Sequence, residues 1–125
     1  MALYRTRFLE GFSLGDSPAF EVWYVLQRER LQRLVIHALQ RLTGYHEERG
    51  EIEEAFQCAW RQMELEPSRE KTHQQLMRLL VYSGRRGAAL KQYQTCRRIL
   101  AAELGVEPAK QTTELFEQIR DGKYE

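Results

Sequence analysis

Cysteine, which forms disulfides, and histidine, which with cysteine binds many metal ions, are both scarce in this sequence of 125 residues. Two cysteines are too few for a disulfide framework, and neither Cys58 nor Cys96 has a C-x-x-C partner. Both fall within helical patterns, which predicts buried packing thiols in a reducing cytoplasm. The three histidines, His37, His46 and His73, lack the i, i+4 spacing of a helical metal site. The sequence therefore predicts no metal site, and His73 is interpreted as a partly buried packing residue.

Signatures of catalysis and of phosphate binding are also missing. The sequence contains no glycine-rich phosphate loop, no G-x-S-x-G and no H-E-x-x-H. Carboxylates are plentiful, but we interpret them as solvated groups with arginines one turn away, such as Glu29 and Arg33. We therefore predict that the chain is not an enzyme and holds no cofactor.

Membrane segments and a surplus of positive charge are absent from the sequence as well. No stretch approaches the roughly 18 apolar residues that span a membrane, and residues 1–5 lack the apolar run of a signal peptide, so a cytoplasmic location is predicted. The net charge of +1 lacks the basic excess of a domain that binds nucleic acid unaided. The clusters Arg85-Arg86 and Arg97-Arg98 are interpreted as solvated surface, the alternative being an acidic partner or DNA held by another domain.

Apolar residues recur at gaps of three and four along most of the chain, which is the periodicity of α-helices. This pattern predicts helices over residues 18–48, 51–65, 68–83, 86–104 and 107–120, and no period-two strand pattern persists. The prolines stand at the boundaries of these helices, at Pro18, Pro67 and Pro108. Ser17 and Ser68 are the expected N-caps, and a break near Gly44 would divide the first helix.

A 34-residue period is the strongest signal in the sequence. Four pairs of similar residues lie 34 positions apart, at Leu42 and Leu76, Gly50 and Gly84, Ala55 and Ala89, and Leu65 and Ile99. A fixed period of this length in helical sequence is the signature of tetratricopeptide (TPR) repeats. The glycines would allow a tight turn within each helix hairpin, and the alanines would let its two helices approach closely.

We therefore predict an all-α, TPR-like fold in which antiparallel helix hairpins stack into a right-handed α-α superhelix. A single domain would span residues 1–125, with a head segment (1–15), two hairpins (18–66 and 68–104) and a capping helix (107–120). The tail 121–125 is expected to fray. Thr43 and His46 depart from the usual repeat, which has a glycine and an aromatic residue at these places, and a plain helical bundle is the alternative.

Several segments together resemble one family. They are Tyr4-Arg5-x-x-Phe8-Leu9-Glu10-Gly11-Phe12, Asp16-Ser17-Pro18-x-Phe20-Glu21-x-Trp23, Tyr45-x-Glu47-Glu48-Arg49-Gly50 and Glu103-Leu104-Gly105-Val106-Glu107-Pro108. Over nearly its whole length the sequence resembles the bacterial transcriptional activator domain of antibiotic regulatory proteins. The resemblance implies a TPR-like domain that usually follows a winged helix-turn-helix DNA-binding domain. No helix-turn-helix precedes Tyr4, so the chain resembles a fragment of a larger regulator or a stand-alone module.

The candidate binding site is the concave groove of the predicted array, which the first helix of each hairpin would line. Its predicted residues are His37, Gln40, Lys71, Gln74, Arg78 and Tyr82. Long polar side chains beside an aromatic ring can hold an extended or helical peptide, the alternative being an unoccupied solvated face. Trp23 and Tyr24, together with Phe12, would form an exposed apolar patch if the head segment does not fold back, which would favour a homodimer.

The resemblance and the repeat together predict a regulatory protein-interaction domain of a bacterial transcription regulator. Its partner would be a protein or peptide segment, which includes its own DNA-binding domain, the transcription machinery or a second copy of the chain. No direct binding of nucleic acid and no membrane contact are expected, because a separate domain would supply DNA binding. The alternative is a stand-alone TPR adaptor or scaffold that is unrelated to transcription.

Overall fold

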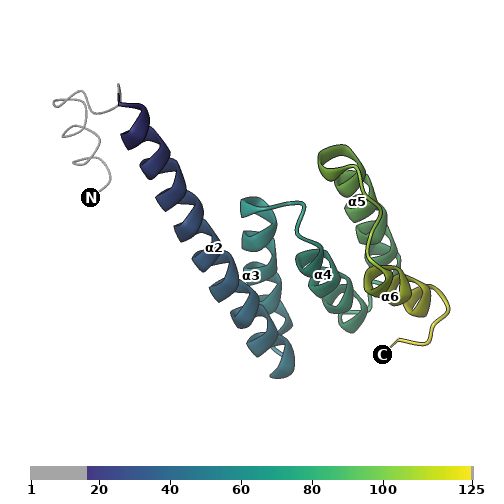
Figure 1. Cartoon of the computed structure of the whole chain (residues 1–125). Helices are drawn as coiled ribbons and strands as arrows, with labels where there is room; N and C mark the ends of the chain where they lie inside the picture. The colour runs from purple at the N-terminus through teal and green to yellow at the C-terminus, as the bar shows by residue number, and fades with distance from the viewer. Residues whose placement is uncertain (1–16, 125) are drawn as a thin grey trace. The chain divides into compact units, whose positions relative to one another are not determined.

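The computed structural model of the chain describes residues 17–124, so the predicted head segment lies outside the described residues. Within them the chain forms five helices and no strand. Figure 1 shows these helices, which are α2 (Pro18–Glu48), α3 (Ile52–Leu65), α4 (Glu70–Tyr82), α5 (Arg86–Leu104) and α6 (Lys110–Arg120). The predicted all-α, TPR-like fold class is confirmed. None of the helices in this range has the length and apolar character that a membrane crossing requires.

The chain divides between Val35 and Ile36 into two compact units, which are considered separately. The first unit contains the N-terminal half of α2, and the second contains its C-terminal half together with α3 to α6. No break occurs at Gly44, because α2 continues to Glu48.

The helix starts agree only in part with the predicted caps. Ser17 is confirmed as the N-cap of α2, since its Oγ accepts a hydrogen bond from the Phe20 N–H at 3.3 Å. Ser68 is not a cap, because α4 begins at Glu70 and Arg69 precedes it. The reason is a turn closed by a hydrogen bond from the Arg69 N–H to the Glu66 carbonyl, which contains Ser68 and delays the helix.

Three helices end in the same left-handed glycine turn, at Gly50, Gly84 and Gly122. At each one, the glycine N–H donates to the carbonyl three residues earlier. The N–H of the residue after the glycine donates to the carbonyl that lies five residues before that residue. This is the Schellman arrangement, which needs a residue with positive φ. The predicted bends at Gly50 and Gly84 are therefore confirmed. The turn at Gly122 is an additional finding: α6, predicted only as a cap, ends as the first helix of each hairpin ends.

Gly84→Ala is expected to lower the free energy of unfolding by about 1–2 kcal/mol, because φ is +79° there and a Cβ strains that conformation. Open space surrounds this position, so the effect comes from the backbone alone. Gly87→Ala is the matched control. It lies in the first turn of α5, also in open space, and should raise stability by about 0.4–1 kcal/mol. Urea denaturation of both variants checks the opposite signs, and equal shifts would contradict the argument.

Helix α4 lies at the centre of the second unit and buries residues on two sides. Leu76 and Leu79 pack against Ala55 and Ala59 of α3. A second cluster joins α4 to α5 and α6, and its buried members are Met77, Leu80, Ala89, Tyr93, Leu115 and Ile119. The alanines are fully buried, and their small side chains allow the close approach of neighbouring helices that the 34-residue period predicts.

The C-terminal end of α6 is attached to the first residue of α5. The Arg86 guanidinium donates a hydrogen bond from Nε to the Ile119 carbonyl at 2.7 Å, and a second from Nη2 to the Arg120 carbonyl. A cation at these carbonyls interacts favourably with the helix dipole and satisfies acceptors that the helix leaves unpaired.

Candidate functional site

The six predicted groove residues lie in the second unit, His37 and Gln40 on α2 and the others on α4. We call them together the α4 surface. His37, Lys71 and Tyr82 are exposed, whereas Gln40, Gln74 and Arg78 are half-buried. Within residues 17–124, neither His37 nor Lys71 makes a hydrogen bond or an ion pair to the other four. The remaining members are held by contacts that the sequence pattern did not predict.

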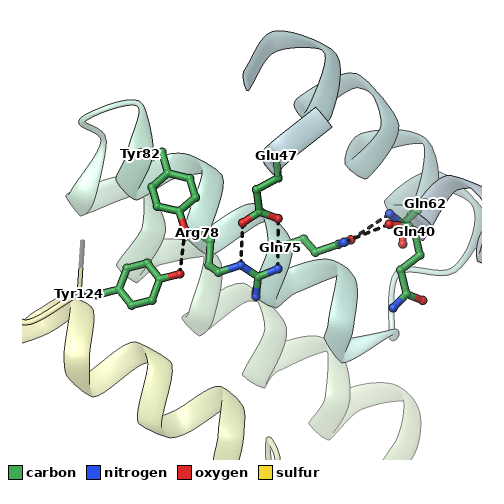
Figure 2. Close-up of polar contacts among 7 residues, drawn as sticks. All are labelled: Gln40, Glu47, Gln62, Gln75, Arg78, Tyr82 and Tyr124. Atoms are coloured by element: carbon green, nitrogen blue, oxygen red, sulfur yellow. Dashed lines mark hydrogen bonds and ion pairs between the residues drawn. The ribbon is translucent and has the colours of Figure 1, made fainter. Parts of the chain in front are cut away.

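Arg78 forms a two-point ion pair with Glu47 of α2. Figure 2 shows the carboxylate facing the guanidinium, with Nε 2.8 Å from Oε2 and Nη2 3.3 Å from Oε1. The side chains are 28% and 13% exposed, so water screens the pair only partly. Burial alone would lower the pKa of Arg78, but the hydrogen bonds and charge of Glu47 outweigh it and raise that pKa above its usual value. Glu47 lies in residues 45–50, one of the segments that carry the family resemblance. No signal in the sequence predicts its ion pair with Arg78.

Tyr82, at the end of α4, contacts Tyr124 beyond the turn at Gly122. The two hydroxyl oxygens are 3.1 Å apart, and the rings stack with centroids 6.1 Å apart (Figure 2). Burial, followed by the hydrogen bond to Tyr82, raises the pKa of Tyr124 well above its usual value. The expectation that the tail frays is therefore wrong as far as Tyr124, because this ring packs against the core cluster of α4, α5 and α6.

Gln74 connects α4 to the start of α6. Its Nε2 donates to Thr112 Oγ1 at 2.7 Å, and Thr112 Oγ1 donates in turn to Glu70 Oε2 at 2.5 Å. The same carboxylate oxygen accepts the Ala109 N–H at 2.8 Å. A carboxylate at this end suits the helix dipole of α6. These bonds account for the start of α6 at Lys110, later than the predicted residue 107.

Gln40 joins α2 to a buried amide network behind the α4 surface. The Gln75 Nε2 donates to the Gln40 carbonyl at 3.3 Å, and the Arg69 guanidinium donates to the Gln40 side chain. Figure 2 shows Gln40, Gln62 and Gln75 grouped where α2 meets the two following helices. The position of Gln40 is therefore fixed from two sides.

Gln62 of α3 is the centre of that network. Its Nε2 donates to Thr43 Oγ1 at 2.9 Å and to Gln75 Oε1 at 3.0 Å, and its Oε1 accepts from Thr72 Oγ1 at 3.1 Å. Gln62 is completely buried, yet both of its amide protons and its oxygen are paired. Thr43, which departs from the repeat pattern, is thus a hydrogen-bonding partner that a glycine could not replace.

His73 is fully buried beneath the α4 surface, between two hydrogen-bond partners. Its Nε2 lies 2.7 Å from the Pro67 carbonyl oxygen, and its Nδ1 lies 2.9 Å from Gln92 Nε2. The carbonyl requires a proton on Nε2, so Nδ1 accepts from the Gln92 amide. Burial lowers the pKa of His73, although the Pro67 carbonyl opposes this effect. Within residues 17–124, no cluster of three His, Cys, Asp or Glu side chains is arranged to hold a metal ion.

The buried His73 makes stability depend on pH. Its pKa in the folded chain lies below 6.5, so only the unfolded chain takes up this proton as the pH first falls below about 6.5. The free energy of unfolding should therefore decrease between pH 7.5 and 5.5, by up to ~1.4 kcal/mol per pH unit. Urea denaturation at both pH values measures the slope. His73→Gln should flatten it and His37→Gln, at an exposed position, should not; an unchanged slope in His73→Gln would contradict the assignment.

Comparison with known proteins gives a match to one protein family. The family model described as the bacterial transcriptional activator domain matches residues 1–120 of the chain. No curated protein and no solved structure matches the chain.

Proposed function

We propose, since the chain belongs to the bacterial transcriptional activator domain family, that it regulates transcription by binding another protein segment through the α4 surface. The family match, which covers nearly the whole chain, is the observation that carries this proposal. DNA binding is supplied by a separate domain, and the chain itself catalyses no reaction. The partner is the chain's own DNA-binding domain or a component of the transcription machinery, which places the interaction in the cytoplasm.

The contacts within the α4 surface support a binding role because they fix its polar groups in place. Gln74 and Arg78 each make a hydrogen bond or ion pair to another helix, and Tyr82 is held by Tyr124. Side chains that are already ordered lose little conformational entropy when a partner binds. Lys71 and His37, which stay exposed, supply groups for direct contact.

Tethering tests the proposal directly. The 125-residue chain is fused to an unrelated DNA-binding domain, and transcription is measured from a bacterial reporter that carries the matching operator. The fusion should change reporter transcription several-fold relative to the DNA-binding domain alone. Lys71→Glu and His37→Glu should remove most of this change, because both positions are exposed and the substitutions spare the internal contacts.

Lys91→Glu is the matched control, since Lys91 is an exposed lysine on α5 outside the α4 surface. It should leave reporter transcription unchanged. Equal losses in Lys71→Glu and Lys91→Glu would contradict the proposed surface, and an inactive fusion would exclude the transcription machinery as the partner and leave the chain's own DNA-binding domain. Salt-dependent binding of a DNA duplex by the untethered chain would contradict the assignment of DNA binding to another domain.

A further inference from the structure

The two ends of the α4 surface differ in their chemistry. At one end Lys71 is exposed, and Arg69 stands just before it as the residue that precedes α4. At the other end Tyr82, which is 44% exposed, stacks on Tyr124. Tyr82 follows Lys71 by eleven residues on the same helix, which separates them by about 16 Å. A partner that fits this surface must match positive charge and an aromatic ring at that distance.

The cationic end has hydrogen-bond donors that the chain itself does not pair. The Arg69 guanidinium donates to the side chain of Gln40, but its Nε is buried without a partner within residues 17–124. Lys71 makes no ion pair in the same range. His37 lies one turn before Gln40 on α2 and adds an exposed imidazole beside them. A carboxylate is the acceptor that suits a guanidinium next to an ammonium group.

The neighbouring carboxylates do not neutralise this end of the surface. Glu47 is paired with Arg78 nearer the other end, with Nε and Oε2 2.8 Å apart. Glu70 is half-buried and accepts two hydrogen bonds from the start of α6. The two charges of Arg69 and Lys71 exceed the single charge of Glu70, so an excess of positive charge faces an incoming group.

The polar groups between the two ends favour an extended partner. Within residues 17–124, Gln74 uses only its Nε2, toward Thr112, and Arg78 uses Nε and Nη2, toward Glu47 (Figure 2). Gln74 Oε1 therefore remains as an acceptor and Arg78 Nη1 as a donor. An extended backbone needs such partners for its own N–H and C=O groups, whereas a helix pairs most of its own.

We propose that the α4 surface binds an extended peptide segment that carries an acidic residue and, about five positions away, a large apolar residue. Five extended residues span about 16 Å, the separation of Lys71 and Tyr82. The carboxylate pairs with Lys71 and Arg69, and the apolar side chain packs on the Tyr82 ring. This inference rests on the proposed function, because it takes the α4 surface as the binding face. Nucleic acid fits less well, since a duplex presents many phosphates and this end offers two cations.

Selection from a phage-displayed library of random dodecapeptides, with the full chain immobilised, tests this chemistry. The enriched peptides should carry aspartate or glutamate several-fold more often than the unselected library, with leucine, phenylalanine or tryptophan about five positions away. The same selection on Lys71→Glu should lose the acidic preference. Absence of any enrichment, or enriched peptides without an acidic bias, would overturn the proposal.

Fluorescence anisotropy with the most enriched peptide, synthesised and labelled, measures the contribution of the charge. Lys71→Glu should raise the dissociation constant by about tenfold or more, whereas Lys71→Arg, which keeps the charge, should change it little. Lys91→Glu, at an exposed lysine of α5, should leave the constant unchanged. Equal effects of Lys71→Glu and Lys91→Glu would contradict the proposal, because the overall charge of the chain would then attract the peptide.

An unlabelled DNA duplex is the competitor that separates a peptide site from a general anion site. It should not displace the labelled peptide, and displacement would overturn the proposal. The reporter experiment separates this inference from the proposed function. Reporter transcription that depends on Lys71, together with selected peptides that lack an acidic bias, would overturn the partner chemistry alone. Selection of acidic peptides, together with reporter transcription that is insensitive to Lys71→Glu, would contradict the proposed function alone.

Discussion

Gln62→Ala is expected to lower the free energy of unfolding by about 2–4 kcal/mol, the larger of the two effects expected from single substitutions. The change removes a completely buried side chain and leaves the side-chain Oε1 of Gln75 and the Thr72 hydroxyl without their partner. An unpaired buried polar group loses its hydrogen bond with water and gains none in return. Urea denaturation followed by circular dichroism measures the loss.

Gln57→Ala is the matched control for this substitution. Gln57 lies on the same helix and is exposed, so the same chemical change should alter stability by less than about 0.5 kcal/mol. If the two variants lose equal stability, the buried network does not hold α2, α3 and α4 together as the geometry implies.

Arg78→Leu is expected to destabilise the chain by about 2–3 kcal/mol, because it leaves the Glu47 carboxylate largely buried and without its cation. Adding Glu47→Leu should recover most of this loss, since the double variant has no uncompensated charge. A double-mutant cycle from urea denaturation gives the coupling energy. Failure of the second substitution to recover stability would mean that Arg78 acts through packing alone.

An exposed ion pair in the same chain provides the control. Arg97 and Glu107 lie 3.3 Å apart, with side chains 55% and 74% exposed. Arg97→Leu should change stability by less than about 1 kcal/mol, because water screens this pair. Arg78→Glu would place two carboxylates together and disrupt the α4 surface. Partner binding is therefore tested at Lys71, which is exposed and makes no ion pair within residues 17–124.

The repeat was predictable from sequence because each of its marker residues acts through its own local conformation. Gly50 and Gly84 recur at one period and each needs a conformation that glycine adopts most easily, so spacing and chemistry agree. Ser17 was likewise found from its place before Pro18. Ser68 has equally suitable chemistry, but the turn before α4 includes it, and sequence alone does not fix the length of a turn.

The contacts of the candidate site were not predictable in the same way. Glu47 pairs with Arg78 and Tyr82 with Tyr124 across 31 and 42 residues, and no periodicity links such partners. Gln62 resembles any surface glutamine in the sequence, because only the stacking of three helices encloses it. Helical spacing did predict which α4 side chains share a face, yet which of them are tied to neighbouring helices depends on tertiary packing.

The attachment of α6 at both of its ends affects how the second unit unfolds. Glu70, at the start of α4, holds the first turn of α6, and Arg86, at the start of α5, holds its last carbonyls. Short terminal helices ordinarily fray independently of the rest of a domain. Here, detaching either end of α6 breaks a charge-assisted bond to a different helix, so all three helices belong to one cooperative unfolding unit.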